Sequence, residues 1–179
     1  SAKDLGEPLP CRPHAVSVAL PRWEDVIAYE EKVPACINKL KAIYPRFGFN
    51  PYVAELAHKC LEFHGESHKS SWPFPNKASA LNAQKYCLRE NPNCYIKIED
   101  FLGVSFLIAD QRSTPSAKAF WQHTGLGLSS REAAIALGKE KEPSASDGHC
   151  AKAKLLNRLA YIYNCDSNLI RLYRSGMAA

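Results

Sequence analysis

The sequence predicts a mixed α/β protein, and two kinds of pattern carry that prediction. Apolar residues recur at helical spacing in several segments, most clearly after Pro51, whereas residues 104–109 and 169–173 are short apolar runs typical of buried strands. The chain has 179 residues, of which 46% are hydrophobic and 23% charged, ordinary values for a globular protein. That length is enough for one domain, or for one domain and part of another.

Residues 1–50 are expected to form an N-terminal arm with short helices. Four prolines fall in its first 21 residues, so this part is predicted to be extended, with one edge strand over residues 15–20. Apolar spacing then predicts short helices over residues 23–32 and 36–43. Two prolines and a glycine in residues 44–51 break the periodicity, which predicts a structured loop.

Residues 51–138 are expected to hold a helix followed by a further α/β segment. Pro51 suits a first helical turn, Asn50 is a good cap, and Gly65 ends that helix. Its apolar stripe predicts a buried face. The other elements expected here are a helix from Asn76 to Arg89, a weak strand over 95–98, a central strand over 104–109, a helix from Pro115 to His123, and a helix capped by Ser129 and Glu132 that ends at Gly138.

The last part of the chain is predicted to be a linker, a helix, a strand and a turn. Residues 139–150 are polar and hold a proline and a glycine, so they are expected to be a linker. A helix is predicted over residues 151–163, and a buried strand over residues 169–173. The side chains expected to point inward from that helix are Leu155, Leu156, Leu159, Ile162 and Tyr163.

The strand is followed by Ser175 and Gly176, which break it, and by Met177, Ala178 and Ala179, which favour a helix. A serine and a glycine between a strand and a helix are typical of an anion cradle, because free N–H groups and the positive helix end meet there. A strand with no successor and a helix of one turn cannot close a core. We therefore expect this chain to be the N-terminal piece of a longer protein.

The distribution of charged, apolar, cysteine and histidine residues argues against a nucleic-acid, membrane or metal partner. The net charge of +5 is mild and basic residues are scattered among acids, so no nucleic-acid face is predicted. No apolar run approaches the length of a membrane span, so no membrane partner is inferred. Seven cysteines without a CxxC pair, and no apolar block near residue 1, predict reduced thiols in a cytoplasmic protein. His58, Cys60, His64 and His68 lie close together but match no strong zinc spacing, so no metal site is predicted.

Two segments have the composition of an anion site. Tyr44 and Arg46 are two positions apart, so in an extended loop both side chains reach the same side. Spacing alone favours the plainer interpretation of a tyrosine packed on a turn and a surface arginine. Residues 125–131 resemble an anion loop before a helix but lack a lysine, and a glycine-rich joint explains them as well. Trp121, His123 and Thr124 beside that loop could line a pocket, although a histidine next to a tryptophan is more often packing.

These segments together resemble a known family. Tyr44-Pro45-Arg46, followed by Asn50-Pro51 and a helix, resembles the Tyr-x-Arg…Asn-Pro segment of the Cys/Met-metabolism pyridoxal-phosphate enzymes. Ser175-Gly176-Met177-Ala178-Ala179 resembles their Ser-Gly-Met phosphate cradle, and residues 154–173 resemble the helix and strand that precede it. The gap between the two motifs is far longer than in bacterial enzymes. That insertion, with residues 117–125 and 129–131, and the arm at 16–25 resemble the fungal cystathionine γ-synthase group.

The resemblance implies the N-terminal portion of a fold-type I, aminotransferase-like pyridoxal-phosphate transferase, with an extended arm, an inserted α/β segment and, in residues 151–179, the start of the cofactor domain. It implies that Tyr44 and Arg46 reach the phosphate of a neighbouring subunit, hence a homo-oligomer. It also implies that Ser175, Gly176 and Met177 hold the phosphate of the cofactor.

The activity that the resemblance implies uses small amino-acid substrates. The γ-leaving group of an activated homoserine is replaced by the thiol of cysteine, which is the transsulfuration step of methionine biosynthesis, with pyridoxal 5′-phosphate as electron sink. The lysine, aspartate and stacking aromatic that the family needs lie downstream of the cradle. No catalytic residue is therefore named, and we expect the chain to be inactive alone.

Two other interpretations stay open. The chain could be a non-catalytic interaction or regulatory module derived from this family. The sequence after Ala179 distinguishes the two: an aspartate and a lysine in family context would favour the enzyme, and a stop codon would favour the module. It could also bind a different phosphate ligand through residues 125–131.

Overall fold

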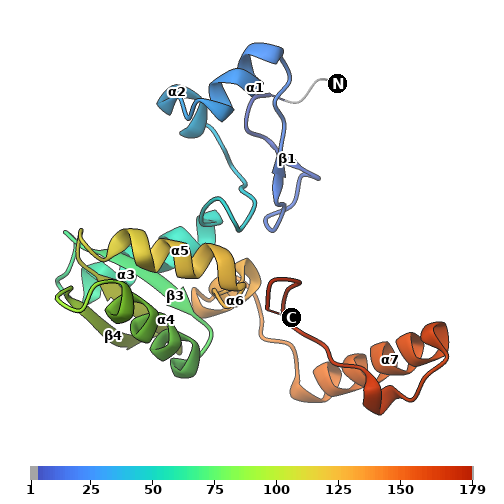
Figure 1. The fold of residues 1–179 in the computed structure, drawn as a ribbon. Coiled ribbons are helices and arrows are strands. Elements are labelled where there is room, and N and C mark those ends of the chain that lie inside the picture. The colour runs from blue at the N-terminus through green and yellow to red at the C-terminus, as the bar shows by residue number, and fades with distance from the viewer. Residues whose placement is uncertain (1–3, 179) are drawn as a thin grey trace.

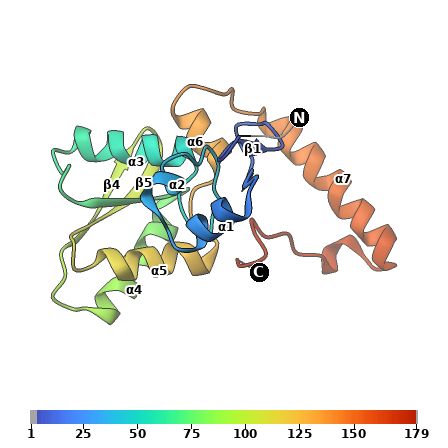
Figure 2. The same ribbon diagram turned by 90° about the horizontal axis from the view of Figure 1, so that it is seen from above.

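The computed structural model describes residues 4–178 and shows a mixed α/β chain. Figure 1 shows an N-terminal arm, an α/β unit built on one sheet, and a C-terminal helix that points away from that unit. The chain ends between the arm and this helix, close to the α/β unit, in both views (Figure 2). No helix in the described part of the chain is both long and apolar enough to cross a membrane.

A three-stranded antiparallel sheet lies at the centre of the α/β unit. Strand β5 (Val104–Ala109) lies between β3 (Ser70–Phe74) and β4 (Ile96–Phe101). Successive side chains of a strand point to opposite faces, and here both faces of β5 are covered. Every residue of β5 is therefore buried, which confirms the prediction of a central strand.

The helices form a layer on each face of the sheet. Val104, Phe106 and Ile108 pack against α3 (Pro51–Phe63) and the region of α6 (Ser130–Ala136). Leu107 and Ala109 pack on the other face, against α4 (Lys77–Glu90) and α5 (Thr114–Thr124). Figure 2 shows these two layers with the sheet between them.

The predicted caps of these helices are confirmed. The Asn50 side chain accepts a hydrogen bond from the Tyr52 N–H at 3.0 Å, with Pro51 in the first turn of α3. Asn76 accepts from the Ser79 N–H at 2.9 Å and starts α4. Ser129 and Glu132 form the predicted capping box of α6.

Strand β3 was not predicted. It contains Pro73, and a proline argues against a central strand because it has no N–H for the ladder. Here β3 is an edge strand, paired with β5 through Trp72↔Leu107 and its neighbours. The outer carbonyl of Pro73 accepts a hydrogen bond from the Leu128 N–H at 3.0 Å, so the loop between α5 and α6 runs along this edge.

The arm is less regular than predicted. The expected edge strand over 15–20 is only β2 (Ser17–Val18), which pairs antiparallel with β1 (Pro8–Leu9). Helix α1 (Trp23–Glu30) lies inside its predicted range, whereas α2 (Pro34–Ile37) stops well before residue 43. Cys36 is the one buried residue of α2, and so small a buried apolar surface does not stabilise a longer helix.

The C-terminal helix α7 spans Ala145–Tyr163 and begins before the expected start at residue 151. It does so because Ser144 caps it, accepting from the Asp147 N–H at 3.1 Å. The predicted inward face of this helix is wrong for the described chain. None of its side chains is buried, and the residues expected inward are exposed or half-exposed, namely Leu155, Leu156, Leu159, Ile162 and Tyr163.

The predicted buried strand over residues 169–173 is also wrong. A short 3₁₀ helix, η1 (Ser167–Leu169), is followed by irregular backbone, and Leu169 is 74% exposed. An apolar run becomes a strand only when a neighbour pairs with it, and no strand in residues 4–178 lies beside this one. The expected helix after Gly176 is a turn in its described part, and Ala179 lies outside the described residues.

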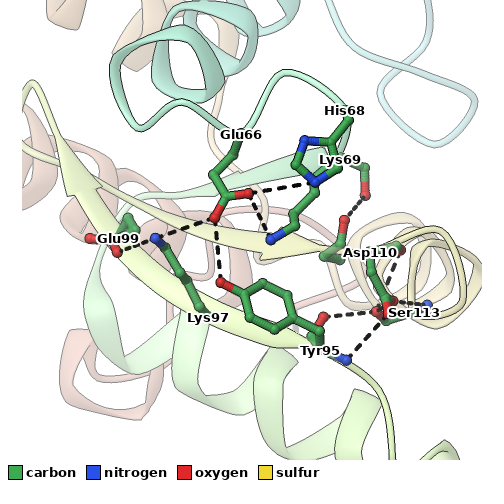
Figure 3. Close-up of polar contacts among 10 residues, drawn as sticks. Glu66, His68, Lys69, Tyr95, Lys97, Glu99, Asp110 and Ser113 are labelled. Carbon is green, nitrogen blue, oxygen red and sulfur yellow. Dashed lines mark hydrogen bonds and ion pairs between the residues drawn. The ribbon is translucent and has the colours of Figure 1, made fainter.

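A polar cluster fixes the loop between α3 and β3 to the outer strand of the sheet (Figure 3). The Lys69 ammonium lies 2.7 Å from a Glu66 carboxylate oxygen and 3.6 Å from the centre of the Tyr95 ring. Lys97 lies 3.6 Å from Glu66 and 2.9 Å from Glu99. Lys69, its closest cation, holds the pKa of the Glu66 carboxyl below its ordinary value.

Candidate functional site

One cavity of about 440 Å³ collects residues from four segments that lie far apart in the sequence. The arm contributes His14 and Val16, the loop before α3 contributes residues 43–50, and the tail contributes residues 174–177. The end of α5 and the loop after it form the remaining wall, with Trp121, Gln122, Gly125, Gly127, Leu128, Ser129 and Ser130. All five residues predicted to bind the cofactor line this cavity, namely Tyr44, Arg46, Ser175, Gly176 and Met177.

Tyr44 and Arg46 lie on a tight turn that lines the cavity. The Phe47 N–H donates to the Tyr44 carbonyl at 2.8 Å, and the Tyr44 and Phe47 rings are 5.8 Å apart. Both predicted residues are exposed. Within residues 4–178 the Arg46 guanidinium has no carboxylate partner and the Tyr44 hydroxyl makes no hydrogen bond. Their donors are therefore available to an anion in the cavity.

The tail lines the cavity with a turn. The Ala178 N–H donates to the Ser175 carbonyl at 3.1 Å, which folds the chain around Gly176 and Met177. The N–H groups of these two residues find no acceptor among the described residues. Unpaired backbone N–H groups on a turn are a common way to bind an anion. The turn lies beside the end of α5, however, and not at the end of a strand as the sequence predicted.

The tail is held in place by the loop after α5. The Ser175 hydroxyl donates to the Gly125 carbonyl at 3.4 Å, and the Arg174 guanidinium pairs with the Glu132 carboxylate on α6. Gly125 has a φ of +65° and ends α5. A Cβ on Gly125 would lie 2.1 Å from the Ser175 Oγ, so only glycine lets the tail approach this closely.

His14 joins the arm to this wall. Its Nε2 lies 2.6 Å from a Glu140 carboxylate oxygen and its Nδ1 lies 2.9 Å from the Ser130 hydroxyl. When His14 is neutral, Nε2–H donates to Glu140 and Nδ1 accepts from Ser130. The Asn50 amide also donates to the Pro13 carbonyl, at 3.1 Å. The arm is thus fixed to the α/β unit where it borders the cavity.

The sequence analysis found part of this wall. Trp121 does line the cavity, as suggested, whereas His123 and Thr124 do not, and Arg131 borders a second, smaller cavity beside the arm. His14, Asn50 and Gln122 were missed, since only the tertiary fold brings them here. A histidine between two short arm strands carries no sequence signal of its own.

The thiols and histidines considered for zinc lie elsewhere. Among residues 4–178 no three histidine, cysteine or acidic side chains gather as metal ligands do. Cys60 lies on the buried face of α3, and burial raises the pKa of its thiol to about 11. Burial likewise raises the pKa of the Cys87 thiol to about 11.

Comparison with known proteins relates the chain to sulfur-amino-acid enzymes. Residues 52–129 match the family model described as the fungal trans-sulfuration enzyme N-terminal domain. The cystathionine gamma-synthase of Neurospora crassa is 27% identical over 165 residues, covering 78% of this chain and 27% of that protein. The cystathionine gamma-synthase of Saccharomyces cerevisiae is 27% identical over 150 residues, covering 74% of this chain and 24% of that protein.

A bacterial relative carries a different name. The L-2-amino-4-chloropent-4-enoate dechlorinase/desaturase of Streptantibioticus cattleyicolor is 27% identical over 180 residues, covering 96% of this chain and 35% of that protein. The chain therefore spans only about a quarter to a third of the length of these relatives. No solved structure matches it significantly.

Proposed function

Residues 52–129 belong to the N-terminal domain family of fungal trans-sulfuration enzymes, and from this premise we propose that the chain holds the phosphate group of pyridoxal 5′-phosphate. The observation that carries the proposal is the single cavity shared by Tyr44, Arg46 and residues 175–177. A guanidinium, a phenol and a serine hydroxyl, with free N–H groups from a turn, suit a phosphate monoester. A cavity of about 440 Å³ is also within the range of small-molecule sites.

Each of these residues has a separate task in the proposal. Arg46 supplies the positive charge and a planar fork of donors for two phosphate oxygens. The backbone N–H groups of Gly176 and Met177 supply two further donors, and neither has an acceptor among the described residues. Gly125 keeps the tail turn close to α5, in the wall of the same cavity that Arg46 lines.

The whole protein is proposed to be a cytoplasmic cystathionine γ-synthase-like enzyme. It would replace the γ-leaving group of an activated homoserine with the thiol of cysteine, in line with the names of two relatives. When bound, pyridoxal 5′-phosphate supplies the electron sink for this chemistry. The residues described here bind and orient the phosphate end, and none of them is given a role in the bond-breaking steps.

We further propose that the phosphate is held within one chain. The resemblance to the family implies that Tyr44 and Arg46 serve a neighbouring subunit, but in this structure they share a cavity with the tail of their own chain. The contacts of His14 with Ser130 and Glu140 hold the arm beside this cavity.

Binding of pyridoxine 5′-phosphate to the 179-residue chain tests the phosphate role. This probe keeps the ring and phosphate but lacks the aldehyde, so it does not react with surface lysines. By calorimetry we expect it to bind more tightly than pyridoxine, and Arg46→Ala to weaken it roughly tenfold or more, since the lost bonds are charge-assisted. Arg89→Ala, on the exposed surface of α4, is the control and is expected to bind as the wild type does. Equal binding of the probe and pyridoxine to the wild type would refute the proposal.

Mixing two defective chains tests whether the site is formed within one chain. Gly176→Asp adds a negative charge where an added Cβ meets nothing within 4 Å, so its effect on phosphate is electrostatic. If each site lies in one chain, a refolded mixture of Arg46→Ala and Gly176→Asp chains stays defective. Recovery of binding in the mixture would mean that Arg46 serves a neighbour, and the phosphate role would stand.

A further inference from the structure

The indole of Trp121 carries a buried polar group that no residue of the described chain satisfies. Trp121 lines the cavity from α5 and is only 7% exposed. Its ring packs edge-on against Phe49, with centroids 4.7 Å apart, and lies 6.4 Å from the Trp72 ring. Its Nε1 is buried and has no hydrogen-bond partner among residues 4–178. Such orphan donors are rare in folded proteins because they give up a bond to water.

The neighbouring tryptophan shows what a satisfied indole looks like here. The Trp72 Nε1–H donates to the Ser70 hydroxyl at 3.1 Å in the same aromatic cluster. Both indole rings lie in the same hydrophobic cluster, but only the Trp72 N–H has an acceptor among the described residues. No acceptor for Trp121 lies among residues 4–178, and a ligand bound in the cavity is one source of it.

The loop beside the indole packs directly against its nitrogen, so an acceptor reaches this atom only when the loop moves aside. A Cβ on Gly127 would lie 2.3 Å from the Trp121 Nε1, so glycine is the residue that keeps a side chain off this atom. The loop is fixed at Leu128 by its bond to the Pro73 carbonyl, and at Gly125 by its contact with the tail. Between these two points Gly127 gives the backbone freedom to move aside.

We propose that the Trp121 indole N–H donates to a phosphate oxygen of the cavity's ligand, opposite Arg46, when the segment 125–127 shifts. This inference rests on the proposed phosphate site and adds a binding residue from the inserted segment. An indole N–H is a donor only, which suits a ligand group that is rich in acceptors and has no proton to give. The wall formed by the insertion is thereby part of the ligand site.

Trp121→Phe tests the inference because it removes the N–H and keeps the aromatic packing. We expect its affinity for pyridoxine 5′-phosphate, and for inorganic phosphate, to fall roughly tenfold, as expected for a lost hydrogen bond to a charged group. The unliganded variant is expected to melt at the wild-type temperature or above, because an unsatisfied donor is gone. Affinity for pyridoxine, which lacks the phosphate, is expected to change little.

Trp72→Phe is the matched control. It breaks the bond to Ser70, so it should lower the melting temperature and leave the affinity for phosphate unchanged. If Trp121→Phe instead binds inorganic phosphate as the wild type does, or is destabilised as much as Trp72→Phe, the inference is overturned. If the wild type binds no phosphate at all, the proposed function has failed first.

Gly127→Ala provides a second, independent variant should Trp121→Phe fail to fold. The new Cβ would occupy the place beside Nε1, and we expect weaker binding of pyridoxine 5′-phosphate while Trp121 itself is intact. Unchanged affinity in this variant would count against the inference.

Discussion

Two glycines with almost the same backbone conformation allow the position of the tail to be tested. Gly125 has a φ of +65° and Gly65 a φ of +67°, and each follows a helix. In this left-handed region an alanine costs roughly 1–2 kcal/mol relative to glycine. Gly125→Ala and Gly65→Ala are therefore expected to carry the same conformational penalty.

The two positions differ in what an added methyl group would meet. At Gly65 there is nothing within 4 Å, whereas at Gly125 the Cβ would lie 2.1 Å from the Ser175 Oγ, 3.1 Å from the Ala178 nitrogen and 3.2 Å from the Met177 Cβ. The serine hydroxyl can rotate away, but the backbone of the tail must move by some tenths of an ångström. That movement displaces the turn at Gly176 and Met177, which lines the cavity.

The expected result separates stability from binding. Each variant should lower the melting temperature by a few degrees, as about 1 kcal/mol does in a protein of this size. Only Gly125→Ala should weaken pyridoxine 5′-phosphate, by roughly tenfold, because small displacements of binding groups are costly. Differential scanning fluorimetry and calorimetry measure the two effects. If both variants bind the probe equally well, the tail does not rest on Gly125 and the proposed cavity is incorrect.

Two further predictions concern the core and the polar cluster. The thiols of Cys60 and Cys87 are buried and their pKa values are raised to about 11, so both should resist iodoacetamide at pH 8 in the folded chain. The exposed Cys11 should react, and peptide mass spectrometry distinguishes the modified sites. Modification of Cys60 or Cys87 without unfolding would contradict the structure. Glu66→Gln should lower the urea midpoint at pH 7, because it removes the partner of Lys69. The pKa of Glu66 is below its ordinary value of 4.5, so its stabilisation is fully present above that pH and is lost as the pH falls through the lowered pKa of the folded state. The wild-type advantage should therefore shrink steadily on acidification below about pH 5, and an advantage that does not change with pH would disprove this role.

The sequence predicted the elements whose signals are local. Asn50 and Pro51 start α3, and Ser129 with Glu132 starts α6, because a cap involves residues only two or three positions apart. The run over 104–109 was recognisable as a central strand because both of its faces are apolar. None of these signals depends on a distant part of the chain.

Elements that depend on distant partners were predicted poorly. Strand β3 contains Pro73 and exists because β5 pairs with one of its edges, which the local sequence does not reveal. The opposite error occurred over residues 169–173, where an apolar run has no strand beside it in the described chain. The exposed apolar side of α7 has the same origin, since periodicity indicates which face could be buried but not whether anything covers it.

The candidate site contains residues that local motifs revealed and residues that only the tertiary fold brings together. Arg46 and Gly176 were selected from short motifs and from their resemblance to a family, and their roles in binding stay predictions. That they share a cavity with His14 and Trp121 could not be deduced from the sequence, since four distant segments must first fold together.

The cavity also bears on what the segment 121–128 does. The family match ends at residue 129, and the part just before that end is the wall that carries Trp121, Gly125 and Gly127. Gly125 packs closely against the Ser175 hydroxyl, and Gly127 packs closely against the Trp121 indole nitrogen. The segment therefore shapes the cavity and does more than extend the surface. The same segment is anchored to the sheet by the Leu128 N–H, so its position depends on the core of the α/β unit. The position of this wall therefore depends on the folding of the α/β unit, and destabilising the edge strand β3 should change the shape of the cavity before it unfolds the arm.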